Sequence, residues 1–297
     1  MVNPRKPHEL NLKLVDGPHG ASLTYRRGYF EGGTRSTALE QTLTAADIIV
    51  RDLPQSDIGV ATLATAFPGT LEKGQVPVVV DIRGADLLKA AKKDNHLAAE
   101  VFMYAFDEEG AVRDRVYQRL MLDVDKVGDK LRQNGVKYVV TLQLPPGKYA
   151  IKTLVRTPAT DQNGYVRSDV TVPKRGETVL LPPFVLDDPQ AWLLINGDRD
   201  HAYPFHVNGM PFVPSASGAM PTGSAHKLVV FICNALPEEL KWETTPQAML
   251  LGQFKAVDVT KLILQLHDAP LSQFGVTVRK KGNEAPLTAT ISLIQRQ

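Results

Sequence analysis

Residues 136–144 read Val-Lys-Tyr-Val-Val-Thr-Leu-Gln-Leu, and this stretch decides the fold class. Apolar side chains stand at every second position from Val136 to Leu144, with Lys137, Thr141 and Gln143 between them. A period of two is typical of a β-strand, whose successive side chains point to opposite faces of a sheet. We therefore expect a half-buried antiparallel strand with its polar residues toward solvent.

The same period recurs along most of the chain. Residues 287–293 alternate in this way, and further strand-like runs cover 76–82, 97–106, 116–124, 149–156, 166–172, 228–233, 254–259, 262–266 and 276–278. Turn residues separate the runs, including Asn-Gly pairs at 134–135, 163–164, 196–197 and 208–209. Short strands with turns every roughly eight to twelve residues favour antiparallel β-sandwiches over alternating strands and helices.

Only three stretches have helical character. Residues 84–95 combine good helix formers with an early Asp, residues 34–47 begin like a capped helix, and residues 237–240 suffice for one turn. We expect short helices or polar excursions there.

The domain organisation follows from length and from a Pro-rich connector. A chain of 297 residues corresponds to about two domains at roughly 150 residues each. Residues 173–190 hold Pro-rich, extended sequence typical of a connector. We predict an all-β protein: an N-terminal hairpin stub at 1–33, then tandem immunoglobulin- or fibronectin-like β-sandwiches at 34–175 and 176–297.

Composition excludes several classes of protein. The formal charge is +2, and no basic patch is visible, so nucleic acid is not an expected partner. No run approaches the ~18 apolar residues that span a bilayer, and no signal peptide is evident, so no membrane insertion is expected. The single cysteine, Cys233, cannot form a disulfide within the chain, and its apolar surroundings predict a buried small side chain.

The order of several segments resembles a known family. Arg26-Arg27-Gly28-Tyr29-Phe30, then 101–110 with Tyr104-Ala105-Phe106-Asp107, then Leu144-Pro145-Pro146-Gly147-Lys148-Tyr149 resemble the region after the A domain in von Willebrand factor A-related proteins of acidobacterial type. Trp192-Leu193-Leu194 and residues 203–214 continue the likeness. The resemblance implies β-rich architecture and an extracytoplasmic location, periplasmic or secreted; the chain by itself, if complete, would be cytoplasmic.

The sequence also departs from that family. An A domain binds a divalent ion through an Asp-x-Ser-x-Ser loop, which this chain lacks; its nearest string, 213–217, has no Asp. The metal-dependent adhesion chemistry is therefore not carried over to any residue. Residues 1–33 would be the end of an A domain whose body is absent, so we expect the chain to be part of a longer protein.

Common enzyme signatures are absent as well. The sequence has no Gly-x-Ser-x-Gly elbow, no Gly-x-Gly-x-x-Gly, no Walker A motif, no His-Glu-x-x-His and no Cys-x-x-Cys. We assign no catalytic residue and no cofactor. The adjacent acids Glu108-Glu109 and Glu238-Glu239 fall in expected turns and are read as solvated charge.

One loop gathers metal-ligand types. Residues 196–206 contain Asp198, Asp200, His201 and His206, which could supply oxygen and nitrogen ligands to a divalent cation. A turn-forming loop is equally rich in Asp and Asn for conformational reasons, with Arg199 pairing one Asp. Trp192, Trp242 and Tyr203 could form a carbohydrate platform, although Trp192 lies in an apolar run typical of a core and Trp242 is the better candidate for an exposed ring.

These patterns together favour a non-catalytic interaction or scaffold module of an exported bacterial protein, which binds a protein partner through loops or sheet edges. The alternative is a carbohydrate- or divalent-metal-binding module that uses the 196–206 loop. A β-sandwich hydrolase is the third hypothesis.

Overall fold

The computed structural model describes residues 7–9, 28–30, 38–69, 72–91, 96–199, 203–220, 226–266, 272–282 and 285–295. The chain divides into two units, residues 1–43 and residues 44–297. In the first unit, strands β1 (Pro7–Glu9) and β2 (Gly28–Phe30) form an antiparallel pair. The other residues of the hairpin stub expected at 1–33 lie outside the described residues.

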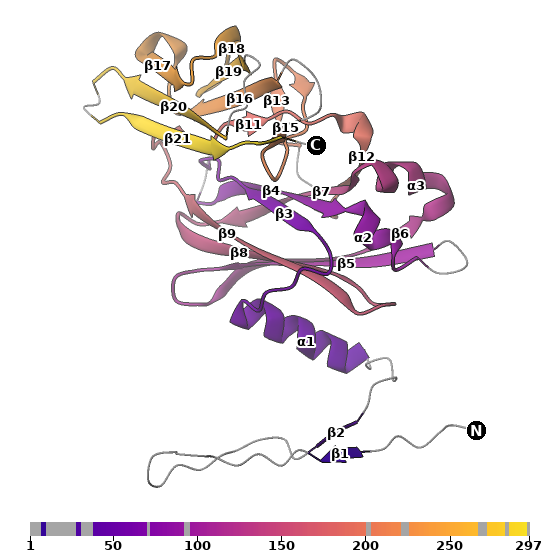
Figure 1. Cartoon of the computed structure of the whole chain (residues 1–297). Coiled ribbons are helices and arrows are strands. Elements are labelled where there is room, and N and C mark those ends of the chain that lie inside the picture. The colour runs from indigo at the N-terminus through magenta and orange to yellow at the C-terminus, as the bar shows by residue number, and fades with distance from the viewer. Residues whose placement is uncertain are drawn as a thin grey trace, which may run out of the picture. The chain divides into compact units, whose positions relative to one another are not determined.

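Strands dominate the second unit, so the expected all-β, sandwich-like class is confirmed (Figure 1). The first sheet has the antiparallel order β6-β5-β8-β9 and contains β5 (His96–Phe106), β6 (Val112–Asp123), β8 (Gly147–Thr157) and β9 (Gln162–Val172). The middle sheet has the order β12-β7-β4-β3 and contains β3 (Val60–Ala64), β4 (Gly74–Arg83), β7 (Gly135–Leu144) and β12 (Trp192–Asn196).

Two further sheets are built from the C-terminal part of the chain. The third sheet has the order β10-β16-β19-β18, with β11 also paired to β16; its strands are β10 (Val179–Leu180), β11 (Phe184–Val185), β16 (His226–Cys233), β18 (Met249–Ala256) and β19 (Val259–Leu266). The fourth sheet has the order β17-β20-β21, with β17 (Leu240–Thr245), β20 (Gln273–Lys280) and β21 (Leu287–Ser292). Short pairs join β13 (His206–Val207) to β14 (Met210–Pro211) and β15 (Ala219–Met220) to β22 (Ile294–Gln295).

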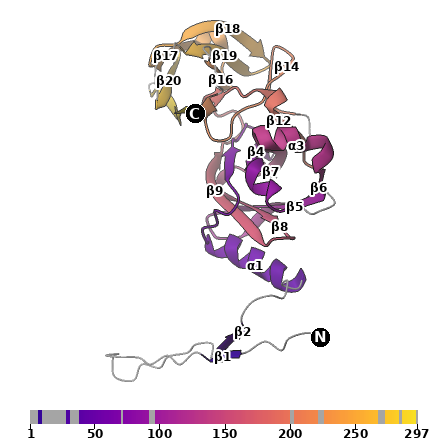
Figure 2. The same ribbon diagram turned by 45° about the vertical axis from the view of Figure 1, so that its right-hand side comes forward.

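The middle sheet is covered on both faces. Its even-numbered β4 and β7 residues, such as Val78 and Tyr138, pack in a core shared with the first sheet. Its odd-numbered residues Val79 and Val139 pack in a second core with Phe184 and other residues of the C-terminal part. Both views show β4 and β7 between the first sheet and the C-terminal strands (Figure 1, Figure 2).

This double burial corrects one expectation and qualifies another. Lys137 and Thr141 were expected at a solvent face, but both are buried because the C-terminal part covers that face; Gln143 is exposed as expected. The division at 175–176 stays a prediction about folding domains. In space, β12 returns from the second half to pair in parallel with β7 of the first half.

The helices differ in part from the expected ones. Helix α1 (Ala38–Arg51) is longer than predicted, and α2 (Gly84–Leu88) is shorter. The described residues include two one-turn 3-10 helices: η2 (Pro237–Glu239), at the predicted place, and η1 (Pro189–Ala191), which was not predicted. Helix α3 (Val124–Gln133) was not predicted. Its signals were the N-cap Asp123, whose side chain accepts from the backbone N–H of Asp125, and apolar residues at the helical spacing 124, 127 and 131.

Turn chemistry also shows differences. Only the Asn-Gly pair at 208–209 makes a hairpin turn with two positive φ angles, of 50° and 74°. Gly164 instead lies inside β9, where a Cβ atom would stand 2.2 Å from the carbonyl oxygen of Ile58. The predicted strand 254–259 is wrong in its extent, because the chain reverses at Val257, with φ of 52°, between β18 and β19.

Candidate functional site

The residues proposed as metal ligands are only partly described. Asp200 and His201 lie outside the described residues. Asp198 is exposed, and its backbone N–H donates to Oε1 of Gln118 at 3.2 Å. The ring of His206 packs edge-on against Tyr203, with centroids 5.7 Å apart. Within the described ranges, no three His, Cys, Asp or Glu side chains come together in a group that could hold a metal ion.

Arg199 has a different partner from the expected one. Its guanidinium forms a two-pronged ion pair with Asp114 on β6, with N–O distances of 2.7 and 2.8 Å, and donates to the carbonyl oxygen of Arg115. Burial by itself would raise the pKa of Asp114. The hydrogen bonds from Arg199 and from the backbone N–H of Gln143 outweigh this effect of burial, so the pKa of Asp114 lies below its ordinary value. The 196–199 segment is thereby tied to the first sheet.

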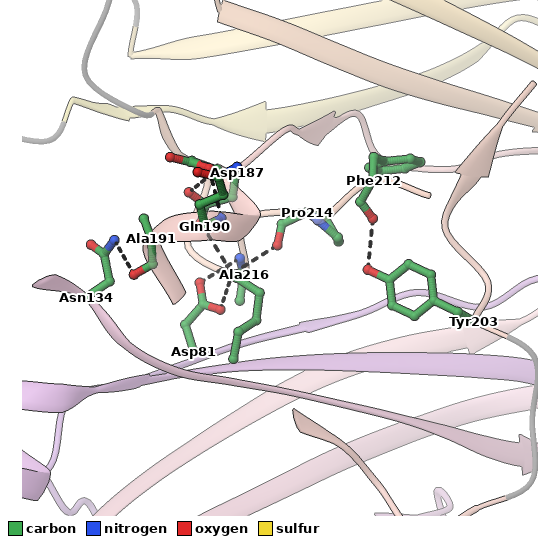
Figure 3. A network of polar contacts seen from close by, with 11 residues as sticks. Asp81, Asn134, Asp187, Gln190, Ala191, Tyr203, Phe212, Pro214 and Ala216 are labelled. Carbon is green, nitrogen blue, oxygen red and sulfur yellow. Dashed lines mark hydrogen bonds and ion pairs between the residues drawn. The ribbon is translucent and has the colours of Figure 1, made fainter. Parts of the chain in front are cut away.

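The aromatic residues are distributed over separate cores. Trp192 is buried, as expected, in the middle sheet. Trp242 is half-buried and packs on the core between the third and fourth sheets. Tyr203 packs in the core beneath the third sheet, and its hydroxyl donates to the carbonyl oxygen of Phe212 at 2.8 Å (Figure 3). The three rings therefore do not form a common surface for stacking sugars.

A buried ionic cluster lies where the two halves of the chain meet. Lys137 on β7 stands directly opposite Asp81 on β4, and its ammonium donates to Oδ1 of Asp81. The same Nζ lies 3.3 Å from Oδ2 of Asp187 and donates to the carbonyl oxygen of Pro214 at 3.1 Å. The other oxygen of Asp81 accepts from the backbone N–H of Ala216 at 3.0 Å (Figure 3).

No pattern of titratable residues in the sequence indicated this cluster. A signal was nevertheless present, because Val78-Val79-Val80 and Val139-Val140 break the alternation with adjacent apolar residues. Continuous apolar runs are typical of strands covered on both faces. Asp81 and Lys137 inside such strands were therefore candidates for buried charge.

A cavity of about 720 Å³ opens beside the cluster. Its lining includes Asp81 and Trp192 from the middle sheet, Arg83 at the end of β4, and Arg132 and Asn134 near the end of α3. Arg132 is paired with Asp129 at 2.8 Å, and the amide of Asn134 donates to the carbonyl oxygen of Ala191 at 3.1 Å (Figure 3). The cavity gives Asp81 a route to solvent.

An apolar sheet edge lies elsewhere in the molecule. Strand β18 is at the end of the third sheet, paired on one side to β19. Met249, Leu250 and Leu251 are consecutive and each 42–43% exposed, and Val257 just beyond the strand is 84% exposed. The register shifts between Leu250 and Gly252, so Leu251 occupies a bulge. Cys233 on β16, which is separated from β18 by β19, is a buried free thiol whose pKa is raised to about 12 by burial.

Comparisons with known proteins add little to this geometry. No protein-family model and no curated protein matches the chain. A β-glucuronidase of Bacteroides uniformis aligns over 41% of this chain and 13% of its own, with 10% identity and a TM-score of 0.26. Bacteroides uniformis β-glucuronidase 2, covalently bound to cyclophellitol-6-carboxylate aziridine, aligns over the same shares with 11% identity and a TM-score of 0.25. The chain spans only 13% of these structures, and likeness at this level carries no inference about activity.

Proposed function

We propose that the chain is a non-catalytic interaction module that binds an extended segment of a partner protein along β18. The observation that carries the proposal is the edge position of an eight-residue strand with three consecutive exposed apolar side chains. An edge strand presents unpaired N–H and C=O groups, and addition of a partner strand is a recurring mode of peptide recognition.

The edge also defines the chemistry of the partner. Its side chains near Met249–Leu251 are apolar, and its one cation, Lys255, stands 4.0 Å from Glu238. A matching segment is extended and carries apolar side chains at alternate positions. Main-chain hydrogen bonds would supply affinity, and the apolar contacts would select the register.

The proposal extends to context and chemistry. In the setting that the segment order resembles, a von Willebrand factor A-related protein, this module would follow the A domain of an exported protein and present β18 outside the cytoplasm. Among the described residues, no helix combines the length and apolar character that crossing a membrane requires. A panel of esterase, glycosidase and peptidase substrates is expected to show no turnover, and turnover would overturn the non-catalytic assignment.

Selection of displayed random peptides on the full chain tests the binding mode. Enriched peptides are expected to be extended and apolar at alternate positions, and to protect the amides of 249–256 from hydrogen exchange. The double variant Leu250→Lys, Leu251→Lys is expected to bind them at least about tenfold more weakly, because a cation replaces apolar contact. Leu194→Lys, at an exposed apolar position on the edge strand β12, is the matched control and should bind normally.

Three results contradict the proposal: no enriched peptide, equal binding by the double variant, or protection that maps to another strand.

A further inference from the structure

Lys137 combines complete burial with two carboxylate neighbours. Its side chain and that of Asp187 have no exposed surface, and that of Asp81 is 8% exposed. Its three ammonium hydrogens have three acceptors: Asp81, Asp187 and the carbonyl oxygen of Pro214. With all three groups ionised, the cluster carries a formal charge of −1 in the interior, where Asp81 alone of the three side chains keeps some exposed surface, at the cavity that it lines.

Burial works against the charged forms of these groups. Removing an ion from water is costly even after relaxation, and a proton shift from the ammonium to a carboxylate would remove two buried charges at once. Burial raises the pKa of Asp81 above its ordinary value, in spite of the opposing attraction of Lys137. The proton shift would place an amine beside a carboxylic acid, and these two groups are the reactants of an amide condensation.

We propose that Nζ of Lys137 and Cγ of Asp81 condense to an amide that links β7 covalently to β4. A neutral Lys amine is a competent nucleophile toward a carbonyl carbon. The N–C bond forms, the bond from Cγ to its hydroxyl breaks, and one water leaves. No oxidant, reductant or cofactor is required.

Asp187 is placed to move the proton. Its carboxylate, 3.3 Å from Nζ, accepts the proton from the attacking nitrogen and returns it to the departing hydroxyl, so that Asp187 is unchanged at the end. The ring of Trp192, with its centroid 4.3 Å from Nζ, shields the amine on another side. The water formed can leave through the cavity that Asp81 lines.

Another Lys–Asp pair in the molecule lacks these features. Lys152 is also buried, and its Nζ lies 3.0 Å from Oδ1 of Asp52. Asp52, however, is 35% exposed and also pairs with Arg167 at 3.2 Å. Burial by itself would raise the pKa of Asp52, but hydrogen bonds from Tyr165 and Lys152 outweigh this effect, so the pKa lies below its ordinary value. This carboxyl therefore stays ionised and unreactive.

Mass spectrometry of the full chain tests the proposal directly. The purified protein is expected to weigh about 18 Da less than its sequence predicts, which is the mass of the water lost when a Lys amine acylates. Because an acylated lysine resists trypsin, residues 133–148 should remain uncleaved after Lys137 and should be joined to residues 74–83. A chain of unaltered mass, or a link between other residues, overturns the proposal.

Variants separate the roles. Lys137→Arg is expected to lose the mass change entirely. Asp187→Asn is expected to slow the reaction by about 10²-fold or more, the usual contribution of a positioned acid–base group. Lys126→Arg, which alters an exposed lysine 2.9 Å from Asp123, is the matched control and should retain the full loss of mass.

Circular dichroism establishes that each variant is folded, and the mass and peptide map of the unaltered chain decide the question even where a variant is not. Full cross-linking in folded Asp187→Asn overturns the role given to Asp187.

Discussion

Phe231 is expected to join the middle and third sheets into one cooperative structure. Its ring is 1% exposed on β16, and its centroid lies 5.5 Å from that of Phe67 and 5.5 Å from that of Phe184, both edge to face. Phe67 comes from the first half of the chain, and the same core contains Val79 and Val139 of the middle sheet. Phe231→Ala therefore removes contacts that cross between the two halves.

The magnitude follows from the burial. Truncation of a buried Phe to Ala costs about 3–5 kcal/mol, as lost transfer energy plus a cavity. Two edge-to-face ring contacts are lost as well, which places the expected decrease in the free energy of unfolding at about 4–5 kcal/mol. With a urea dependence of about 3 kcal/mol per molar, the unfolding midpoint should fall by about 1.3–1.7 M.

The two tryptophans provide separate probes of the unfolding. Trp192 reports on the middle sheet and Trp242 on the fourth sheet. Urea unfolding of Phe231→Ala, measured in the Trp192→Phe and Trp242→Phe backgrounds against each parent, should show the same lowered midpoint from both probes. Val257→Ala, at an 84% exposed position, is the control and should change stability by less than about 0.5 kcal/mol.

A decrease below about 1 kcal/mol would refute the assigned packing. A midpoint that falls only for the Trp242 probe would refute the cooperative coupling of the two halves.

Three further predictions concern polar and reactive groups. Burial raises the pKa of Cys233 to about 12, so this thiol should resist iodoacetamide at pH 8 in the native chain and react fully in urea. Mass spectrometry follows the alkylation, and rapid alkylation of the native chain would contradict the burial of Cys233. The pKa of Asp52 is lowered in the folded state, so its stabilising effect is present above the unfolded pKa of about 3.9 and is lost as pH falls through the folded value. In urea titrations carried from about pH 5 to pH 2, Asp52→Asn should therefore lose less stability than the unaltered chain. Equal losses of stability in the two proteins would argue against this role. Arg199→Lys should lower the free energy of unfolding by about 1–2 kcal/mol, because Lys cannot form the two-pronged ion pair with Asp114. Calorimetry measures the change in stability, and an unchanged melting temperature would show that the ion pair contributes nothing to it.

The strands were predictable because their signal is local. Residues 136–144 and 287–293 alternate in the sequence, and the structure has β7 and β21 there. Helix α3 was missed although Asp123 and the apolar spacing of 124, 127 and 131 marked it, because the flanking strand pattern was extended over its start. Among the strands that were not predicted, β3 and β17 are short, and their side chains are only partly buried.

The candidate sites were harder to predict. Asp198 and His206 were singled out because ligand types are dense in their loop, yet the described part of that loop shows Asp198 exposed and His206 packed on Tyr203. In the cluster around Lys137, Asp81 lies 56 positions before the lysine in the sequence and Pro214 lies 77 positions after it. No spacing in the sequence predicts contacts between residues so far apart.

The amino-acid sequence by itself determined that this is a β-protein, since a period of two is a property of neighbouring side chains. It also determined that Cys233 and Trp192 are buried, because both lie in apolar runs. Only the tertiary structure decided that the polar face of the middle sheet is interior. That outcome depends on the distant part of the chain that covers the face. A lysine is buried at position 137 because Asp81, Asp187 and Pro214 converge there as polar partners for its side-chain nitrogen.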